Sequence, residues 1–423
     1  MFKTPRGMRD VGPLDFARLD YVCGKIKKIL QGYGFQFVSP TALEGFDTLA
    51  AKSGEEIENE LYVFKDKSGR KIGLRFDLTV GIARMVANSN YPRPIKLACI
   101  SNMWRYDRPQ FARYREFWQW DAEILGCSGI EADAEIISVI CDILDSFGLK
   151  YEMKISNRRL IEGFLLSSGV KQKDVLPVLR IIDKSSKISE KEFLKELKKY
   201  TKNTDRILRL INMKKVDIDA IRAENDLTKQ GKKELLDLLA ALKAFGKADK
   251  CSVDLSVVRG IDYYTGLVYE AWIKSDETKK DAKGVKQLGA VAGGGRYDDL
   301  MKIYGKEMPA TGVAGGLERL ILSLKDLPIG QVPKALVIYV NDSVFNKAVE
   351  ITQELRKSVS ASIDLSKRSL SKQLDYANKL GVEKVVIIGP KELAANKAKI
   401  RDMKTGKEKE VELDKLKQFI NQA

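Results

Sequence analysis

The residue types best suited to chemistry are densest at 258–270, which holds Arg259, Asp262 and the adjacent tyrosines Tyr263 and Tyr264. Alternation of residue types predicts a strand, a hairpin and a second strand here. Successive side chains of a strand point to opposite faces, so polar groups would emerge on both sides of the sheet. A strand buried in a core does not need such groups. Arginine stays charged and binds phosphate oxygens through two hydrogen bonds, so the segment is a candidate for anion chemistry.

Two glycine-rich segments follow, and each closes on an arginine. The first runs from Gly293 to Gly295 and ends at Arg296, and the second runs from Gly312 to Gly316 and leads to Arg319. Glycine has no Cβ, so the backbone can approach a ligand closely at such positions. A single glycine turn is unspecific, and only the combination of both segments with 258–270 is informative.

Two further segments, 74–79 and 115–124, alternate between polar and apolar residues, which predicts two strands that each have one polar face. Those faces would carry Arg75, Asp77 and Thr79 in the first strand, and Gln119, Asp121 and Glu123 in the second. The solvated face of an antiparallel sheet would give the same pattern. The density of charged types on several strands instead favours the lining of a site.

Between these strands, four arginines surround a turn that contains Pro109; they are Arg105, Arg108, Arg113 and Arg115. Guanidinium groups buried together without an anion would repel one another and lose their hydration. The segment therefore implies either exposure to solvent or a phosphate ligand.

The chain contains no histidine. This excludes a Ser-His-Asp triad, a Cys-His pair and every metal site that needs imidazole, so chemistry must use carboxylates, tyrosines, cations or substrate groups. The five cysteines are scattered and never form a Cys-x-x-Cys pair. They are typical of reduced thiols in a cytoplasmic protein, and we expect no metal site.

The length of 423 residues allows two or three domains with their own cores. We predict an α+β protein whose core is formed by residues 1–168 and 249–327. A lysine-rich helical domain would be inserted at 169–248, and a small α/β domain would follow at 328–423. No segment is long and apolar enough to predict a membrane span.

The net charge of +16 is uneven along the chain. Residues 171–243 carry a net charge of +7 and residues 334–423 carry +6. Solubility alone would account for basic residues, but two basic segments around a near-neutral middle fit a polyanion that is bound at two places, with RNA as the natural candidate.

Taken together, these motifs resemble those of histidyl-tRNA synthetases, and the resemblance covers essentially the whole chain. It implies the α+β fold of class II synthetases, with an antiparallel catalytic sheet, a helical insertion and a C-terminal anticodon-binding domain. The implied substrates are L-histidine, ATP with Mg²⁺, and tRNA(His), and the implied assembly is a homodimer. The segment Leu74–Thr79 has aspartate at residue 77, and in this form it is similar to the archaeal and eukaryotic members of the family.

The resemblance also assigns roles to individual residues. Arg259 and Arg105 would act on the α-phosphate as catalytic residues. The ATP-binding residues would be Arg105, Arg113, Arg319 and Glu116. The histidine-binding residues would be Asp77, Thr79, Gln119, Glu123, Tyr263 and Tyr264. Asp121 adds a second carboxylate, so either Asp121 or Glu123 could bind the imidazole.

Two other functions fit part of the pattern. A regulatory subunit of ATP phosphoribosyltransferase shares the catalytic fold but usually lacks the C-terminal domain and the ATP-binding arginines, whereas this sequence has both. A tRNA-binding module of a stress sensor would normally be fused to a kinase, and the sequence contains no kinase.

Overall fold

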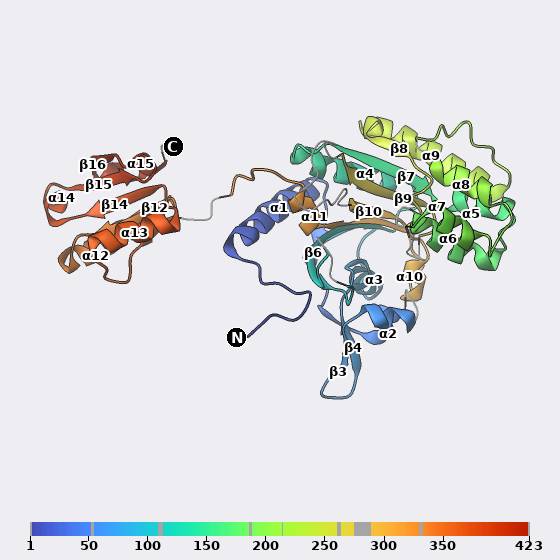
Figure 1. The fold of residues 1–423 in the computed structure, drawn as a ribbon, viewed down its shortest axis with the longest axis horizontal. Coiled ribbons are helices and arrows are strands. Elements are labelled where there is room, and N and C mark those ends of the chain that lie inside the picture. The colour runs from blue at the N-terminus through green and yellow to red at the C-terminus, as the bar shows by residue number, and fades with distance from the viewer. Residues whose placement is uncertain are drawn as a thin grey trace. The chain divides into compact units, whose positions relative to one another are not determined.

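The computed structural model describes residues 2–51, 55–108, 113–185, 188–213, 215–259, 264–274, 289–329 and 333–421. The chain divides into two compact units (Figure 1). One comprises residues 1–12 and 18–327, and the other comprises residues 13–17 and 328–423.

The larger unit is built on an eight-stranded sheet of order β1-β5-β6-β11-β10-β9-β7-β8. Only the end pairs β1–β5 and β7–β8 are parallel, and the strands between them pair in antiparallel fashion. The strands are β1 (Gln36–Phe37), β5 (Ile95–Trp104), β6 (Glu116–Leu125), β7 (Tyr151–Asn157), β8 (Cys251–Val253), β9 (Leu267–Ile273), β10 (Ala290–Arg296) and β11 (Ala310–Gly316). The predicted antiparallel α+β core is confirmed.

One face of this sheet is covered by long helices. Helices α1 (Pro13–Gly32), α4 (Ile130–Ser146) and α9 (Asp226–Ala244) contribute their buried apolar residues to the same core as Trp120, Ala122 and Ile124 of β6. The alternation predicted for 115–124 is therefore correct, because these residues point into the core while Gln119, Asp121 and Glu123 point to the other face.

The other face carries a smaller core and leaves room for a site. Here Leu78 and the α3 (Thr79–Ala87) residues Ile82 and Ala83 share a core with Tyr264 and Tyr297. The residues before α3 form a three-stranded sheet of order β2-β4-β3. Its strands are β2 (Leu43–Gly45), β3 (Val63–Lys65) and β4 (Lys71–Leu74). Two short helices complete this part, α2 (Phe46–Ala50) and α10 (Leu300–Ile303), whereas α11 (Leu317–Leu322) contributes Leu317 and Leu320 to the large core on the helix-covered face.

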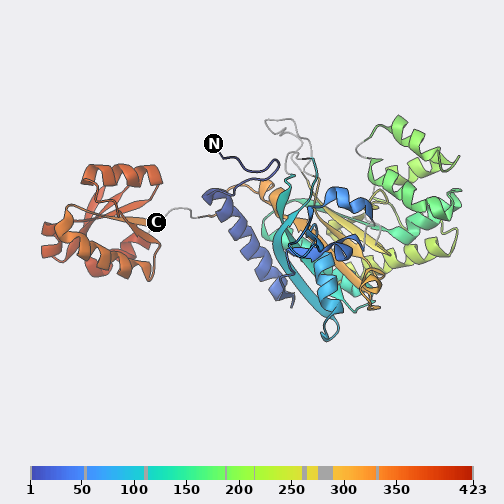
Figure 2. The same cartoon turned by 90° about the horizontal axis from the view of Figure 1, so that it is seen from below.

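The lysine-rich segment is helical, and its helices gather at one side of the large sheet (Figure 2). They are α6 (Val175–Asp183), α7 (Glu190–Leu197), α8 (Thr204–Asn212) and α9, and α5 (Arg158–Ser167) directly precedes them. Helices α5 to α8 share a separate core that includes Leu165, Val178, Phe193 and Ile207, whereas α9 contributes to the large core.

The smaller unit is a five-stranded sheet of order β13-β12-β14-β15-β16. Its strands are β12 (Ala335–Tyr339), β13 (Ala361–Ile363), β14 (Lys384–Ile388), β15 (Lys397–Asp402) and β16 (Glu408–Glu412). One core contains residues of α12 (Phe345–Arg356) and α15 (Leu416–Asn421), and a second core contains residues of α13 (Leu370–Leu380); α14 (Pro390–Ala394) is short. This is the α/β arrangement expected for the C-terminal segment.

One local prediction is wrong. The strand at 74–79 ends at Leu74, and Thr79 already begins α3. Of the hairpin predicted at 258–270, residues 260–263 lie outside the described residues, and β9 begins at Leu267. Among the described residues, no helix is long and apolar enough to span a membrane.

Candidate active site

The floor of the site is the polar face of β6 beside two glycine-rich strands. Glu123 of β6 lies in register with Gly312 of β11, and Gly312 lies in register with Gly295 of β10. A Cβ at residue 312 would overlap the Glu123 carboxylate, so only glycine leaves room for this side chain. Glycine at this position thus lets a fully buried carboxylate lie across the neighbouring strand.

Hydrogen bonds fix the two carboxylates of the floor. The Thr79 hydroxyl donates to Oε1 of Glu123 at 2.7 Å, and the Tyr297 hydroxyl donates to Oε2 of the same group. The Gln119 amide donates to Oδ1 of Asp121 at 2.9 Å. The structure therefore brings Thr79, Gln119, Asp121 and Glu123 together.

Tyr297 is the residue that sequence analysis missed at this floor. It lies inside the segment Gly293–Asp298, where only the glycines and the arginine attracted attention. Its contact with Glu123 joins residues that are 174 positions apart, through strand pairing that no local pattern reveals. A tyrosine directly after a glycine-rich strand was the one available signal.

Asp77 and Arg75 occupy a turn in place of the predicted strand. Oδ1 of Asp77 accepts the backbone N–H of Val80 at 2.9 Å in the first turn of α3, which orders the helix that carries Thr79. Arg75 is buried and donates to the backbone oxygens of Pro40 (2.6 Å) and Asn102 (3.0 Å). Asp77 thus orders the start of α3, whereas Arg75 is structural.

Three arginines expected to bind phosphate lie near one another. Arg105 donates to the backbone oxygen of Phe76 at 2.9 Å, and Arg319 donates to that of Ala290 at 3.0 Å. Burial lowers the pKa of Arg319, and the positive charges of Arg113 and Arg105 lower it further. Like charges that repel in this way would be stabilised by an anion between them.

Arg259 and Tyr264 lie beside the glycines of β10. Arg259 has a left-handed backbone (φ 46°), which is uncommon outside glycine. Its guanidinium overlaps the position that a Cβ at Gly293 would take, and its Cζ is 5.6 Å from the ring centroid of Tyr264. Tyr264 is 5% exposed and contributes to the smaller core, on the same face of the sheet as the floor.

The two remaining site predictions have different outcomes. Tyr263 lies outside the described residues. Glu116 is half-buried at the start of β6 and accepts a hydrogen bond from the Asn102 amide at 2.8 Å. A further carboxylate, Glu318, accepts the backbone N–H of Trp118 at 3.0 Å, and burial raises its pKa.

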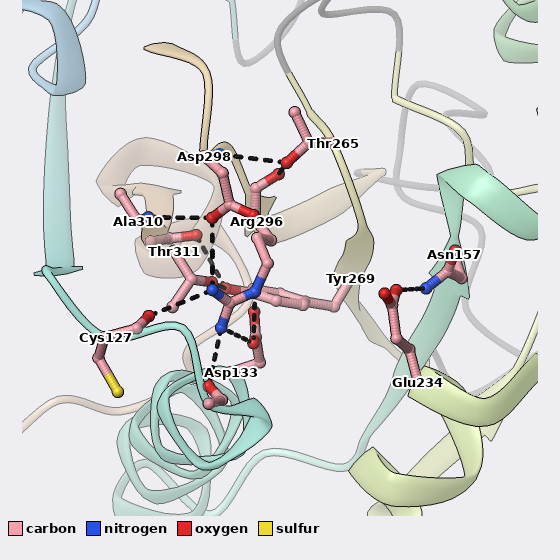
Figure 3. Close-up of polar contacts among 12 residues, drawn as sticks. Cys127, Asp133, Asn157, Glu234, Thr265, Tyr269, Arg296, Asp298, Ala310 and Thr311 are labelled. Carbon is pink, nitrogen blue, oxygen red and sulfur yellow. Dashed lines mark hydrogen bonds and ion pairs between the residues drawn. The ribbon is translucent and has the colours of Figure 1, made fainter. Parts of the chain in front are cut away.

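Arg296 is a structural residue, and Figure 3 shows its contacts. The side chain donates to the buried carboxylate of Asp133 on α4 and to the backbone oxygens of Gly129 (2.9 Å) and Cys127 (3.2 Å). The segment expected to bring backbone close to a ligand thus ends on a buried ion pair that ties β10 to α4.

A pocket of about 550 Å³ lies elsewhere, at the start of β7 and β8 and the end of β9. Its lining includes Lys150, Tyr151, Lys250 and Cys251. Within the described ranges, no group of three or more acidic or cysteine side chains could hold a metal ion.

Comparison with known proteins agrees with this arrangement. The family Histidyl-tRNA synthetase matches residues 7–320, and the family Anticodon binding domain matches residues 334–423. The chain is 39% identical to the histidine–tRNA ligase of Thermococcus kodakarensis, over 97% of this chain and 96% of that protein. It is 34% identical to the histidine–tRNA ligase of Methanocaldococcus jannaschii, over 99% of each.

Solved structures show the same fold. The histidyl-tRNA synthetase of Nostoc sp. is 26% identical, with a TM-score of 0.83 over 99% of both chains. A Bacillus halodurans protein described as an ATP phosphoribosyltransferase regulatory subunit/histidyl-tRNA synthetase is 22% identical, with a TM-score of 0.77 over 92% of this chain and 98% of that one. On this evidence, the chain belongs to the histidyl-tRNA synthetase family and carries an anticodon-binding domain at residues 334–423.

Proposed function

We propose that the floor formed by Gln119, Asp121 and Glu123, with the arginines around it, is where this histidine–tRNA ligase makes histidyl-adenylate from L-histidine and ATP. The adenylate then transfers histidine to the 3′ end of tRNA(His). The histidine carboxylate attacks the α-phosphorus and pyrophosphate leaves. In the second step, a ribose hydroxyl of the tRNA attacks the histidyl carbonyl and AMP leaves.

The observation that carries the proposal is the spacing between the anion-binding and carboxylate ends of the site. Asp121, Ala314 and Gly293 lie in one register row across β6, β11 and β10, and the Arg259 guanidinium lies over Gly293. Asp121 and Gly293 are therefore two strand spacings apart, which is about 10 Å in total. An amino acid could lie along this row with its carboxylate toward Arg259 and its side chain toward the enzyme carboxylates.

The residues divide the work without a protein proton carrier. Arg259 and Arg105 would stabilise the charge that develops at the α-phosphate, and Arg113 and Arg319 would hold the outer phosphates together with Glu116 and the Mg²⁺ that accompanies ATP. Proton transfer is a minor requirement, because a carboxylate is already a nucleophile. A site without histidine is therefore adequate for this reaction.

The histidine substrate would be bound at both of its ends. Asp77, Thr79 and Gln119 would bind its backbone groups, while Glu123 and Tyr264 would bind its imidazole and Tyr263 would shape the pocket. The contacts of Glu123 with Thr79 and Tyr297 support this assignment, because they orient the carboxylate before substrate arrives. Asp121 remains the alternative partner of the imidazole.

Larger-scale features complete the proposal. The basic segments 171–243 and 334–423 would bind tRNA(His), and the protein would act as a homodimer in the cytoplasm, where translation takes place. The chain would divide into core segments 1–168 and 249–327, a helical insertion at 169–248 and a C-terminal domain at 328–423.

Histidine-dependent exchange of pyrophosphate into ATP tests the function. We expect rapid exchange with L-histidine alone among the amino acids, and charging of tRNA(His) once tRNA is added. A histidine-sensing regulatory subunit would bind histidine but support no exchange. Retention of the arginines and of the C-terminal unit favours the ligase over that alternative.

A further inference from the structure

Two tyrosines of the proposed histidine pocket, Tyr264 and Tyr297, are connected to one buried ion pair between β10 and α4. Arg296 ends β10, is 4% exposed, and directs its guanidinium to Asp133, which is 0% exposed (Figure 3). Its Nη1 also approaches Oδ1 of Asp298 at 3.4 Å. Every nitrogen of the guanidinium therefore has a partner, and the end of β10 is held to the first turn of α4.

Tyr297 receives its position from this anchor through the backbone. It lies between Arg296 and Asp298, and both neighbours are fixed by side-chain contacts. Oδ1 of Asp298 accepts the backbone N–H of Ala310 at 3.2 Å, which ties the same turn to β11. The Tyr297 hydroxyl, which donates to Glu123, is consequently held by the residues on both of its sides.

Tyr264 receives its position from the same turn through Thr265. The Thr265 backbone N–H donates to the Arg296 carbonyl at 2.8 Å, and the Thr265 hydroxyl approaches that oxygen at 3.4 Å. The same hydroxyl accepts the backbone N–H of Asp298 at 3.1 Å. The residue directly after Tyr264 is thus joined to both residues that flank Tyr297, as Figure 3 shows for Thr265, Arg296 and Asp298.

We infer that Thr265, Asp298, Arg296 and Asp133 are positioning residues that set the distance between Tyr264 and the Glu123–Tyr297 pair, and hence the selectivity of the pocket for the histidine side chain. The inference rests on the proposed function, in which Glu123 and Tyr264 bind the imidazole. None of the four needs to touch substrate. They act through Tyr264 and Tyr297.

Thr265→Val is the informative variant, because valine keeps the shape of threonine and loses only the hydroxyl. We expect the KM for histidine in pyrophosphate exchange to rise about tenfold, as loss of one well-placed hydrogen bond implies, while the KM for ATP changes less than about twofold. Thr265→Ser keeps the hydroxyl and should restore the KM for histidine to within about twofold of the unmodified enzyme.

Thr201→Val is the matched control. The Thr201 hydroxyl makes the same pair of contacts in the helical segment, since it donates to the Ser168 carbonyl at 2.6 Å and accepts the Asn203 N–H at 3.1 Å. Thr201→Val should lower the melting temperature, as Thr265→Val does, and leave the KM for histidine unchanged. Equal changes in both KM values for Thr265→Val, or a rise in the KM for histidine that Thr201→Val matches, would overturn the inference.

The unmodified enzyme separates this inference from the proposed function. Absence of histidine-dependent exchange in the unmodified protein would remove the proposed function itself. Normal exchange in the unmodified protein, with an unchanged KM for histidine in Thr265→Val, would leave the function intact and refute the positioning role alone.

Discussion

The guanidinium of Arg259 fills the space that a Cβ at Gly293 would occupy. Residue 293 is central in β10 and lies in register with Ala314 of β11 and Glu270 of β9. A cation is therefore held against β10, two strands away from the Asp121 and Glu123 carboxylates of β6. Substitution of Arg259 removes this cation and substitution of Gly293 displaces it, so the two variants test the same role.

Arg259→Ala should lower the rate of adenylate formation by about 100- to 1,000-fold, because one preorganised group that stabilises the transition state is lost. Arg259→Lys should recover only part of the rate, since an ammonium lacks the planar fork of the guanidinium. Pyrophosphate exchange measures the first effect, and the Kd for tRNA should stay nearly constant. A near-normal exchange rate in Arg259→Ala would refute the role.

Gly293→Ala should displace the same guanidinium without removing it, so that exchange falls by about 100-fold with Arg259 still present. Gly24→Ala is the control, because a Cβ at residue 24 of α1 would meet no atom within 4 Å. Gly24→Ala should keep the exchange rate of the unmodified enzyme, so the two variants should differ by about 100-fold. If Gly293→Ala retained full activity, the close approach of Arg259 to β10 would be irrelevant to catalysis.

Tyr264→Phe should weaken histidine binding more than ATP binding, because a buried polar partner of the substrate is left without its hydrogen bond. We expect the KM for histidine to rise about tenfold, which corresponds to 1.4 kcal/mol. Separate titrations of histidine and ATP in the exchange assay distinguish the two substrates. Similar losses for both would indicate general damage to the site.

Removal of residues 327–423 should leave histidine activation intact and abolish efficient charging of tRNA. Residues 18–327 form a compact unit with its own cores, whereas the removed part carries the anticodon-binding domain. Exchange, charging and sedimentation of the shortened protein measure activation, tRNA use and dimerisation. Undiminished charging would show that the domain does not contribute to tRNA binding.

The pH profile of kcat/KM should contain an inflection that belongs to the substrate. The enzyme has no imidazole, and free histidine titrates near a side-chain pKa of about 6.5. Replacement of histidine by a triazole analogue, whose ring is far less basic, should remove or strongly shift the acid limb. An acid limb that stays in place would assign the titrating group to the enzyme, with Glu123 or Asp121 as candidates.

Local patterns predicted the parts of the fold that depend on local sequence. The alternation along β6 correctly separated Gln119, Asp121 and Glu123 from Trp120, because side-chain direction in a strand depends only on its period of two. The same rule failed at Arg75–Thr79, where the Asp77 carboxylate accepts a helix N–H and the chain turns into α3. Alternation alone does not distinguish a strand from a helix start.

Contacts between distant segments could not be predicted in the same way. Tyr297 reaches Glu123 only because β11 lies between β6 and β10, and strand order depends on the whole sheet. Similarly, Arg296 attracted attention as an arginine after a glycine turn, yet its partner Asp133 lies 163 residues away on α4.

The glycines that clear the floor also affect how the chain folds. Three of the seven residues of β10 and three of the seven of β11 are glycine, which has a low preference for strands. These two strands lie between β6 and β9, which are rich in residues that favour strands. We therefore expect β10 and β11 to join the sheet only after their neighbours are in place, so that the catalytic surface is among the last parts to form. A nascent or partly folded chain would then be unable to bind and consume ATP before the enzyme around it is complete.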